Sequence, residues 1–147
     1  MQMKIEEFEF PDNLLYSGEH LWIKIEGDKA LIGFTDLGQA LYKGIMHIDL
    51  PEVGKKLGAG EELAPYETIK SVSKINSPLT GKIIKVNEKL KENPEIINDD
   101  PYGNGWLIEM KIENPDEKGN LMDISEACPL FEKIIKEEKQ RYAYLYE

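Results

Sequence analysis

The sequence predicts a mainly β protein, a sandwich or flattened barrel with one helix at its C-terminus. Three observations predict this fold: many short alternating or β-branched runs, Gly and Pro residues between them, and one late apolar stripe at helical spacing. The chain has 147 residues, 41% of them hydrophobic, which is enough for a core of its own. We therefore expect residues 1–147 to form a single domain.

The expected strands are short and each is bounded by turn residues. They lie at His20–Ile25, Ala30–Phe34, Ile45–Leu50, Lys82–Val86 and Trp106–Ile112. The first two flank the sequence Glu-Gly-Asp-Lys at 26–29, which is typical of a hairpin turn. Antiparallel pairing is therefore expected.

The segments before and between these strands predict an N-terminal arm and one short helix. Lys4–Phe10 alternates, so it is interpreted as an edge strand or an ordered arm within residues 1–13. Thr35 suits a helix N-cap, Asp36 suits the first turn, and Gly44 would end the helix.

The last third of the chain predicts a loop and then a helix. Residues 87–105 contain too many Gly, Pro, Asn and Asp residues for a long regular element. Asp123 or Ser125 can cap a final helix within residues 123–147, which form the C-terminal helix and tail. Pro129 is then expected in the first turn, where a missing N–H costs least. The helix has an apolar stripe that is expected to dock on the chain's own sheet: Ala127, Leu130, Phe131, Ile134 and Ile135.

Composition excludes several classes of function. A net charge of −10 would repel phosphate backbones, so nucleic-acid binding is not expected. One cysteine and two histidines allow no internal disulfide and show no metal-site spacing. No signal peptide or membrane span is recognisable, so a cytoplasmic protein without a membrane partner is expected. No catalytic motif is present, so we expect no independent enzyme.

One stretch, Glu67–Gly81, stands out as the candidate site. It reads ETIKSVSKINSPLTG and is interpreted as a tight turn between two strands, with Lys70 at or near its tip. Leu63–Tyr66 before it is short and apolar, and the strand expected after it begins at Lys82. A lysine in a turn is usually only a solvated charge, so its position alone assigns no chemistry to Lys70.

Motifs along the chain, taken in order, resemble the H protein of the glycine cleavage system, a family of lipoyl carriers. The sequence Glu67-Thr-Ile-Lys70-Ser resembles the lipoylation motif of that family, and the whole resemblance covers residues 14–131. The other motifs are His20 with Trp22, Gly33-Phe-Thr-Asp36, Leu50-Pro-Glu-Val-Gly54, Ser77-Pro-Leu-Thr-Gly81, Val86-Asn-Glu88, Asn98-Asp-Asp-Pro-Tyr-Gly103 and Gly105-Trp-Leu107.

The resemblance implies a fold, a cofactor and partners. The fold would be a barrel-sandwich hybrid of the lipoyl/biotinyl-carrier type, with two small antiparallel sheets and the lysine at a hairpin tip. Lys70 would carry lipoic acid as an amide, and Glu67 would serve recognition by a lipoylating enzyme. The arm would shuttle an aminomethyl group and reducing equivalents between glycine decarboxylase, aminomethyltransferase and dihydrolipoyl dehydrogenase. Biotin is disfavoured, because Ile69 and Ser71 rather than methionines flank the lysine.

The chain departs from the family at positions that would line a cleft for the loaded arm. Leu21 stands where the family has an acid, and Lys74 where an aspartate is common. Because a cationic cargo needs acceptors, these changes should weaken the cleft. The candidate cleft residues are Glu19, His20, Leu21, Leu37 and Lys74.

Two alternatives therefore stay open beside the aminomethyl carrier. One is an H-like lipoate-binding protein with another cargo, such as those that work with heterodisulfide-reductase-like complexes in sulfur oxidation. The other is a non-catalytic lipoyl-relay or interaction protein.

Overall fold

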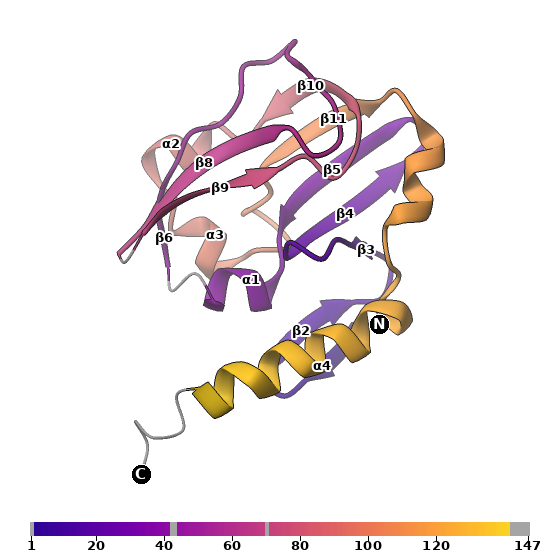
Figure 1. The fold of residues 1–147 in the computed structure, drawn as a ribbon. Helices are drawn as coiled ribbons and strands as arrows, with labels where there is room; N and C mark the ends of the chain where they lie inside the picture. The colour runs from indigo at the N-terminus through magenta and orange to yellow at the C-terminus, as the bar shows by residue number, and fades with distance from the viewer. Residues whose placement is uncertain (1, 42–43, 70, 142–147) are drawn as a thin grey trace.

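A computed structural model describes residues 2–41, 44–69 and 71–141, and it shows a mainly β fold (Figure 1). The strands are β1 (Gln2–Ile5), β2 (Phe8–Pro11), β3 (Leu15–Tyr16), β4 (Leu21–Glu26), β5 (Lys29–Phe34), β6 (Ile45–Ile48), β7 (Lys56–Leu57), β8 (Glu62–Thr68), β9 (Val72–Asn76), β10 (Gly81–Val86) and β11 (Ile108–Ile112). The helices are α1 (Asp36–Leu41), α2 (Lys89–Glu92), α3 (Ile96–Asp99), α4 (Ile124–Arg141) and the 3-10 helix η1 (Pro115–Asn120).

The described strands form three antiparallel sheets. A six-stranded sheet has the order β3-β4-β5-β11-β10-β7, a three-stranded sheet has the order β6-β8-β9, and β1 and β2 form a separate hairpin. The two larger sheets pack face to face without closing into a barrel. The predicted sandwich-like, mainly β fold is confirmed, and the N-terminal hairpin is a third layer that the sequence did not predict.

The main core lies between the two larger sheets. Phe34 of β5 meets Tyr66 of β8 edge to face, with ring centroids 5.7 Å apart. Residues of both sheets contribute buried side chains to one cluster, among them Leu21, Ile23, Ile32, Ile48, Leu63, Ile75, Leu79, Ile83 and Ile108. Burial of these apolar side chains supplies most of the driving force for the sandwich.

The predicted hairpin at 20–34 is confirmed as β4 and β5, and a glycine on it has a packing role. Gly33 is paired across the hairpin with Trp22. A Cβ at Gly33 would lie 2.6 Å from the indole ring, so only glycine leaves room for it. The indole Nε1 then donates a hydrogen bond to the carbonyl oxygen of Pro101 at 2.9 Å, which fixes the loop that follows α3.

The interpretation of Glu67–Gly81 as a single turn was wrong in extent. Val72–Asn76 is a strand, β9, which pairs with β8 from Glu67↔Val72 to Glu62↔Asn76. Only Ile75 of β9 is buried, so the strand has no alternating apolar pattern that the sequence could reveal. β8 ends at Thr68 and β9 begins at Val72.

The predicted helices form, with one correction. Thr35 caps α1, since its Oγ1 accepts the Gly38 N–H at 2.9 Å. Asp123 caps α4: its Oδ1 accepts the Glu126 N–H at 2.9 Å, and Glu126 accepts the Asp123 N–H in return. Pro129 therefore lies in the second turn and not in the first. Its missing N–H removes the helical hydrogen bond to the carbonyl oxygen of Ser125, an exposed residue. Residues 87–105 contain only the two single-turn helices α2 and α3.

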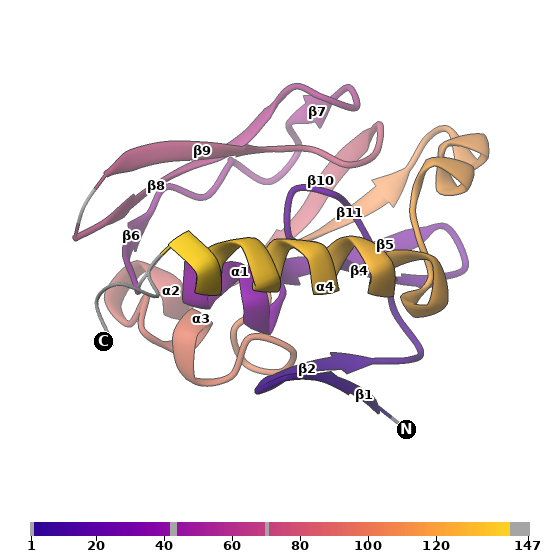
Figure 2. The same ribbon diagram turned by 60° about the horizontal axis from the view of Figure 1, so that its bottom comes forward.

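A second core lies under α4, on the other face of β4. Trp22, Tyr16 and Phe10 contribute to it together with the predicted stripe of the helix, of which Ala127, Phe131 and Ile135 are buried. The stripe packs on the sheet as predicted, but it also holds the N-terminal hairpin in place (Figure 2). Among the helices that the structure describes, none has the length and apolar character needed to cross a bilayer.

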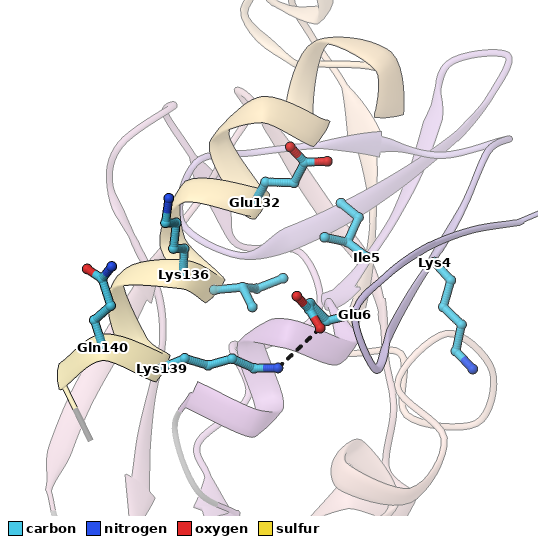
Figure 3. Close-up of a pocket in the computed structure, with 8 residues that line it drawn as sticks. Lys4, Ile5, Glu6, Glu132, Lys136, Lys139 and Gln140 are labelled. Carbon is cyan, nitrogen blue, oxygen red and sulfur yellow. Dashed lines mark hydrogen bonds and ion pairs between the residues drawn. The ribbon is translucent and has the colours of Figure 1, made fainter. Parts of the chain in front are cut away.

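The arm predicted at Lys4–Phe10 is a complete hairpin. Glu6 adopts the left-handed conformation, with φ of 55°, at the turn between β1 and β2. A hollow of about 630 Å³ lies between this hairpin and α4, and Lys139 Nζ is 3.3 Å from a carboxylate oxygen of Glu6 across it. Figure 3 shows Lys139 reaching toward Glu6, while Lys4 and Lys136 point away. Ile5 and Ile135 line the hollow. The hollow is a seam between two packed elements.

Candidate functional site

The candidate site is the hairpin of β8 and β9, which extends beyond the rest of the fold (Figure 1). Thr68 donates its N–H to the carbonyl oxygen of Ser71 at 2.9 Å, and Ser71 donates its N–H to Thr68 Oγ1 at 3.2 Å. Only Ile69 and Lys70 stand between these two residues. Lys70 itself lies outside the described residues, so its predicted place at the tip stays a prediction.

The base of this hairpin is fixed by its neighbours. β6 pairs with β8 on the side opposite β9, with Ile45↔Thr68 and His47↔Glu67. Asn98 of α3 accepts the Ile45 N–H at 3.1 Å and donates to the Ile45 carbonyl at 3.3 Å. A hairpin closed by hydrogen bonds on a base of this kind suits a modification site, because rigid elements hold a functional group more exactly than a free loop does.

The surface around the hairpin tip is apolar and acidic. Ile69 is 78% exposed, Val72 is 73% exposed and Met46 is 58% exposed, although large apolar side chains are usually buried. Glu67, the predicted recognition residue, is also exposed. Exposed apolar residues clustered in one place indicate a surface that binds a ligand or a partner.

A shallow groove lies beside the tip on the β6 side. Its volume is about 340 Å³, and its lining comes from three segments: Gly44, Ile45, Met46, Ile69, Pro94, Glu95 and Asn98. Sequence reasoning named none of these as site residues. The pairing of β6 with β8 shifts register at Met46, and such a bulge re-aims a side chain. No local sequence signal marks it.

Four of the five candidate cleft residues lie close together: Glu19, His20 and Leu21 are consecutive, and a Cβ at Gly38, next to Leu37, would lie 2.8 Å from the Cβ of His20. That they line a cleft together with Lys74 stays a prediction. Leu21 has no exposed surface and belongs to the main core, whereas Leu37 is 1% exposed and belongs to the core under α4. Neither therefore offers surface to a docked arm. Glu19 is exposed in the loop before β4, and Lys74 is exposed on β9 opposite Pro65.

His20 has a structural role at the start of β4. It adopts φ of 69°, and its carbonyl oxygen accepts the Thr35 N–H at 2.9 Å, which ties the loop before β4 to the N-cap of α1. Burial lowers the pKa of its imidazole, because desolvation disfavours the charged form.

Most residues that carry the family resemblance belong to the frame. Tyr102 Oη accepts the Asp36 N–H at 3.0 Å, which joins two of the motifs. Asn87 is buried and donates its Nδ2 to the carbonyl oxygens of Asn104 and Trp106. A Cβ at Gly81 would lie 2.4 Å from the carbonyl oxygen of Lys111, so only glycine allows β10 to approach β11 so closely. The residues of these motifs stabilise the sandwich, whereas the candidate site lies on the hairpin of β8 and β9.

A β-sandwich that projects a hairpin with a lysine in its sequence has the architecture of carrier proteins of the swinging-arm class. The model of the glycine cleavage H-protein family matches residues 14–134, and the chain belongs to this family. The resemblance seen in the sequence is thereby confirmed.

Individual relatives agree with the family. The glycine cleavage system H protein of Bacteroides thetaiotaomicron is 46% identical over 114 residues, which is 78% of this chain and 90% of that protein. Glycine cleavage system H protein 4 of Aquifex aeolicus is 37% identical over 136 residues, 92% of this chain and 80% of that protein. The crystal structure of a glycine cleavage system H protein from Mycobacterium marinum superposes with a TM-score of 0.75 at 31% identity, covering 82% of this chain and 98% of that one.

Proposed function

We propose that this protein is a lipoyl carrier of the glycine cleavage system, with lipoic acid attached as an amide to Lys70. The observation that carries the proposal is the hydrogen-bonded closure of the hairpin at Thr68 and Ser71, around the lysine of a lipoylation-like motif. Family membership gives the motif its meaning.

The residues described around Lys70 fit such a group. The turn is closed on both sides by hydrogen bonds, and Ile69 before it is largely exposed, so a modifying enzyme can reach this end of the hairpin. Glu67 lies one residue before the closing Thr68 and is exposed on β8, where an enzyme can read it together with the lysine. When attached, lipoic acid supplies a dithiolane that takes up a carbon unit and two electrons and releases them by thiol–disulfide exchange.

The protein's own residues hold the cofactor and present it to partner enzymes. The cofactor and those enzymes carry out the steps that form and break bonds. The two hydrogen bonds between Asn98 and Ile45 hold β6 against α3, and β6 in turn pairs with β8 of the hairpin. A rigid tip with a tethered arm raises the local concentration of the arm at a partner's active site. The protein is thus a carrier component and not an independent catalyst.

The partners follow from this function. They are glycine decarboxylase, aminomethyltransferase, dihydrolipoyl dehydrogenase and a lipoylating enzyme. We place the carrier in the cytoplasm, where its single thiol, Cys128, would stay reduced. The relatives named above favour glycine cleavage over a carrier for sulfur oxidation or a lipoyl relay.

The test is intact mass with peptide mapping on protein isolated from its native cell, for wild type, Lys70→Arg and Lys74→Arg. Lys74 is a matched control, because it is exposed on the same hairpin. We expect a lipoyl adduct on Lys70 in wild type and in Lys74→Arg, and none in Lys70→Arg, with equal thermal unfolding in all three. An unmodified Lys70 in a lipoate-replete cell would overturn the proposal.

A further inference from the structure

Four lysines form a row across four neighbouring strands of the six-stranded sheet. Lys29 of β5 is paired with Lys111 of β11. Lys82 of β10 lies between Lys111 and Lys56 of β7 and is paired with both. Residues directly opposite one another on antiparallel strands point to the same face of the sheet. All four lysines are exposed, so their side chains leave the outer face side by side, over a length of about 14 Å.

This lysine row costs the fold stability. Like charges directly opposite each other destabilise a sheet, and lysine is depleted in strands. Among the residues that the structure describes, no carboxylate lies within 4.0 Å of these four ammonium groups. A lysine on an edge strand can guard a sheet against aggregation, which explains Lys56 on β7. Lys29, Lys82 and Lys111 lie on interior strands, so that explanation does not extend to them.

A second row lies beside the first, nearer to α4. In it Lys85 is paired with Glu109, and Lys24 with Leu31. A hollow of about 270 Å³ lies here, lined by Lys24, Glu26, Lys29, Leu31, Lys85 and Glu109. Glu26 is opposite Lys29 in the register, but its carboxylate pairs with Lys24 at 3.3 Å. The two rows thus hold six of the chain's 18 basic residues and only two of its 28 acidic residues, so a basic surface stands on a protein of net charge −10.

The lysine row lies away from the hairpin of β8 and β9. Figures 1 and 2 both show the turn between β4 and β5, from which Lys29 begins β5, at the opposite end of the fold from the end of that hairpin. The sheet that contains the hairpin packs on the inner face of the six-stranded sheet, whereas the lysines occupy the outer face. A partner bound to the lysines would therefore leave the hairpin free.

The spacing of the row suits one kind of acidic partner. Neighbouring lysines are about 4.8 Å apart at the backbone, which is the distance between strands. Acidic residues one turn apart on a helix are separated by about 5.4 Å, so a helix that lies across the strands places its carboxylates nearly in step with the lysines. Acids on one face of an extended strand are about 6.7 Å apart and fall out of step.

Charge argues against two other occupants. A nucleic acid extends beyond a row of about 14 Å and then meets a chain whose net charge is −10. A second copy of this chain offers one long helix, α4, but the exposed side of that helix mixes both signs, with Glu132, Lys133, Lys136 and Glu137. An acidic helix of a different protein meets neither objection.

We propose that the outer face of the six-stranded sheet is a docking site for an acidic helix of a partner protein. The helix lies across β7, β10, β11 and β5, with its carboxylates on the lysine row. Because this site is separate from Lys70, the protein stays bound to such a partner while its hairpin visits other active sites. The inference does not depend on the modification of Lys70.

The probe for this site is a synthetic alanine-based helical peptide with glutamates on one face, at positions i, i+4, i+7 and i+11. A second peptide of the same composition has its glutamates spread around the helix. Each is titrated at low ionic strength into isotope-labelled, unmodified protein, and amide chemical shifts are followed by NMR. We expect the first peptide to shift the amides of Lys29, Lys82 and Lys111, to leave those of Thr68 and Ile69 in place, and to bind more tightly than the second.

Neutralising two lysines separates binding from folding. Lys82→Gln combined with Lys111→Gln should weaken binding of the first peptide about fivefold, because two charge pairs are lost. The same variant should raise Tm by about 2 °C, because it relieves repulsion between paired lysines. Lys133→Gln combined with Lys136→Gln is the matched control, since both residues are exposed on α4 and the change in net charge is equal. It should change neither the affinity nor raise Tm.

Several outcomes would overturn the proposal. They are an unmoved lysine row, shifts at Thr68 and Ile69 in its place, and equal binding of the two peptides. A lower Tm for Lys82→Gln with Lys111→Gln would show that the row has a structural role instead. A short single-stranded DNA of equal charge that bound the same amides as tightly would assign the face to nucleic acid. Shifts of these amides with protein concentration alone would assign it to a second copy of the chain.

Discussion

The ring of Phe10 in the N-terminal hairpin stacks on the ring of Phe131 in the C-terminal helix, with centroids 4.8 Å apart and planes 14° from parallel. Tyr16 meets both rings edge to face. This contact joins the two ends of the chain on one face of the sheet. We predict that Phe10→Ala lowers the free energy of unfolding by about 3–5 kcal/mol, because it removes a fully buried aromatic side chain and leaves a cavity.

Urea unfolding followed by circular dichroism measures this change. Val53→Ala is a suitable control, because an exposed position of this kind should change stability by less than about 0.5 kcal/mol. A loss below about 1 kcal/mol for Phe10→Ala would mean that the N-terminal hairpin is not part of the cooperative core.

Tyr102 ties the same hairpin to α1. Its hydroxyl donates to the carbonyl oxygen of Glu9 at 2.5 Å and accepts the Asp36 N–H, while the Glu9 N–H donates to Asp36 Oδ2. Tyr102→Phe should cost about 1–3 kcal/mol, since it leaves partly buried backbone groups without this partner. Amide hydrogen exchange should quicken at Glu9 and Asp36 and stay unchanged at Ile23 in the middle of β4. Unchanged exchange at all three would contradict the role of Tyr102.

The parts of the fold that the sequence predicts well are those with local signals. The hairpin of β4 and β5 has alternating strands and a Gly-containing turn, and Gly27 there has the positive φ that such a turn needs. β9 was missed because four of its five residues are not buried, so pairing with β8 rather than an apolar pattern makes it a strand. The turn of the N-terminal hairpin was missed because Glu6 and Glu7 carry no turn signature.

The residues of the candidate site also fall into those that the sequence could indicate and those that only the folded structure brings together. The candidacy of Lys70 and Glu67 came from their resemblance to a family motif, and membership of that family is shown. The groove could not be foreseen, because Ile45 and Asn98 stand 53 residues apart in sequence and only the folded backbone brings them into contact. The same resemblance places Leu21 and Leu37 in a cleft, which stays a prediction; in the structure Leu21 is buried in the main core and Leu37 in the core under α4.

The lowered pKa of the buried His20 predicts that the folded protein loses stability as the pH falls. Burial lowers its pKa in the folded state below the ordinary value of 6.5, so the unfolded chain binds a proton first. The free energy of unfolding should therefore decrease as the pH falls from about 6.5 toward the lower, folded-state pKa. Urea unfolding at pH 7.5 and pH 5 measures the difference.

The matched variant for this test is His20→Asn, which tolerates the left-handed backbone that His20 adopts. It should be less sensitive to pH between 7.5 and 5 than wild type. The hydrogen-bonded carboxyl of Asp123 also has a lowered pKa, but it titrates below this window and is the same in both proteins. An equal loss of stability in both proteins would show that another group is responsible.

Replacing Glu67 should slow lipoylation of the protein without affecting its folding. It is exposed on β8, three residues before Lys70, and we expect a lipoylating enzyme to contact its carboxylate. Glu67→Gln should lower kcat/KM for lipoylation about tenfold, the size expected for one contact in an enzyme–protein interface. Glu62→Gln is the matched control, because Glu62 is exposed on the same strand but pairs with Asn76 at the end far from the turn. Initial rates from mass spectrometry over a range of carrier concentrations give kcat/KM, and thermal unfolding checks the fold. If Glu67→Gln and Glu62→Gln were lipoylated equally fast, Glu67 would be only a surface acid, and recognition would depend on the shape of the hairpin.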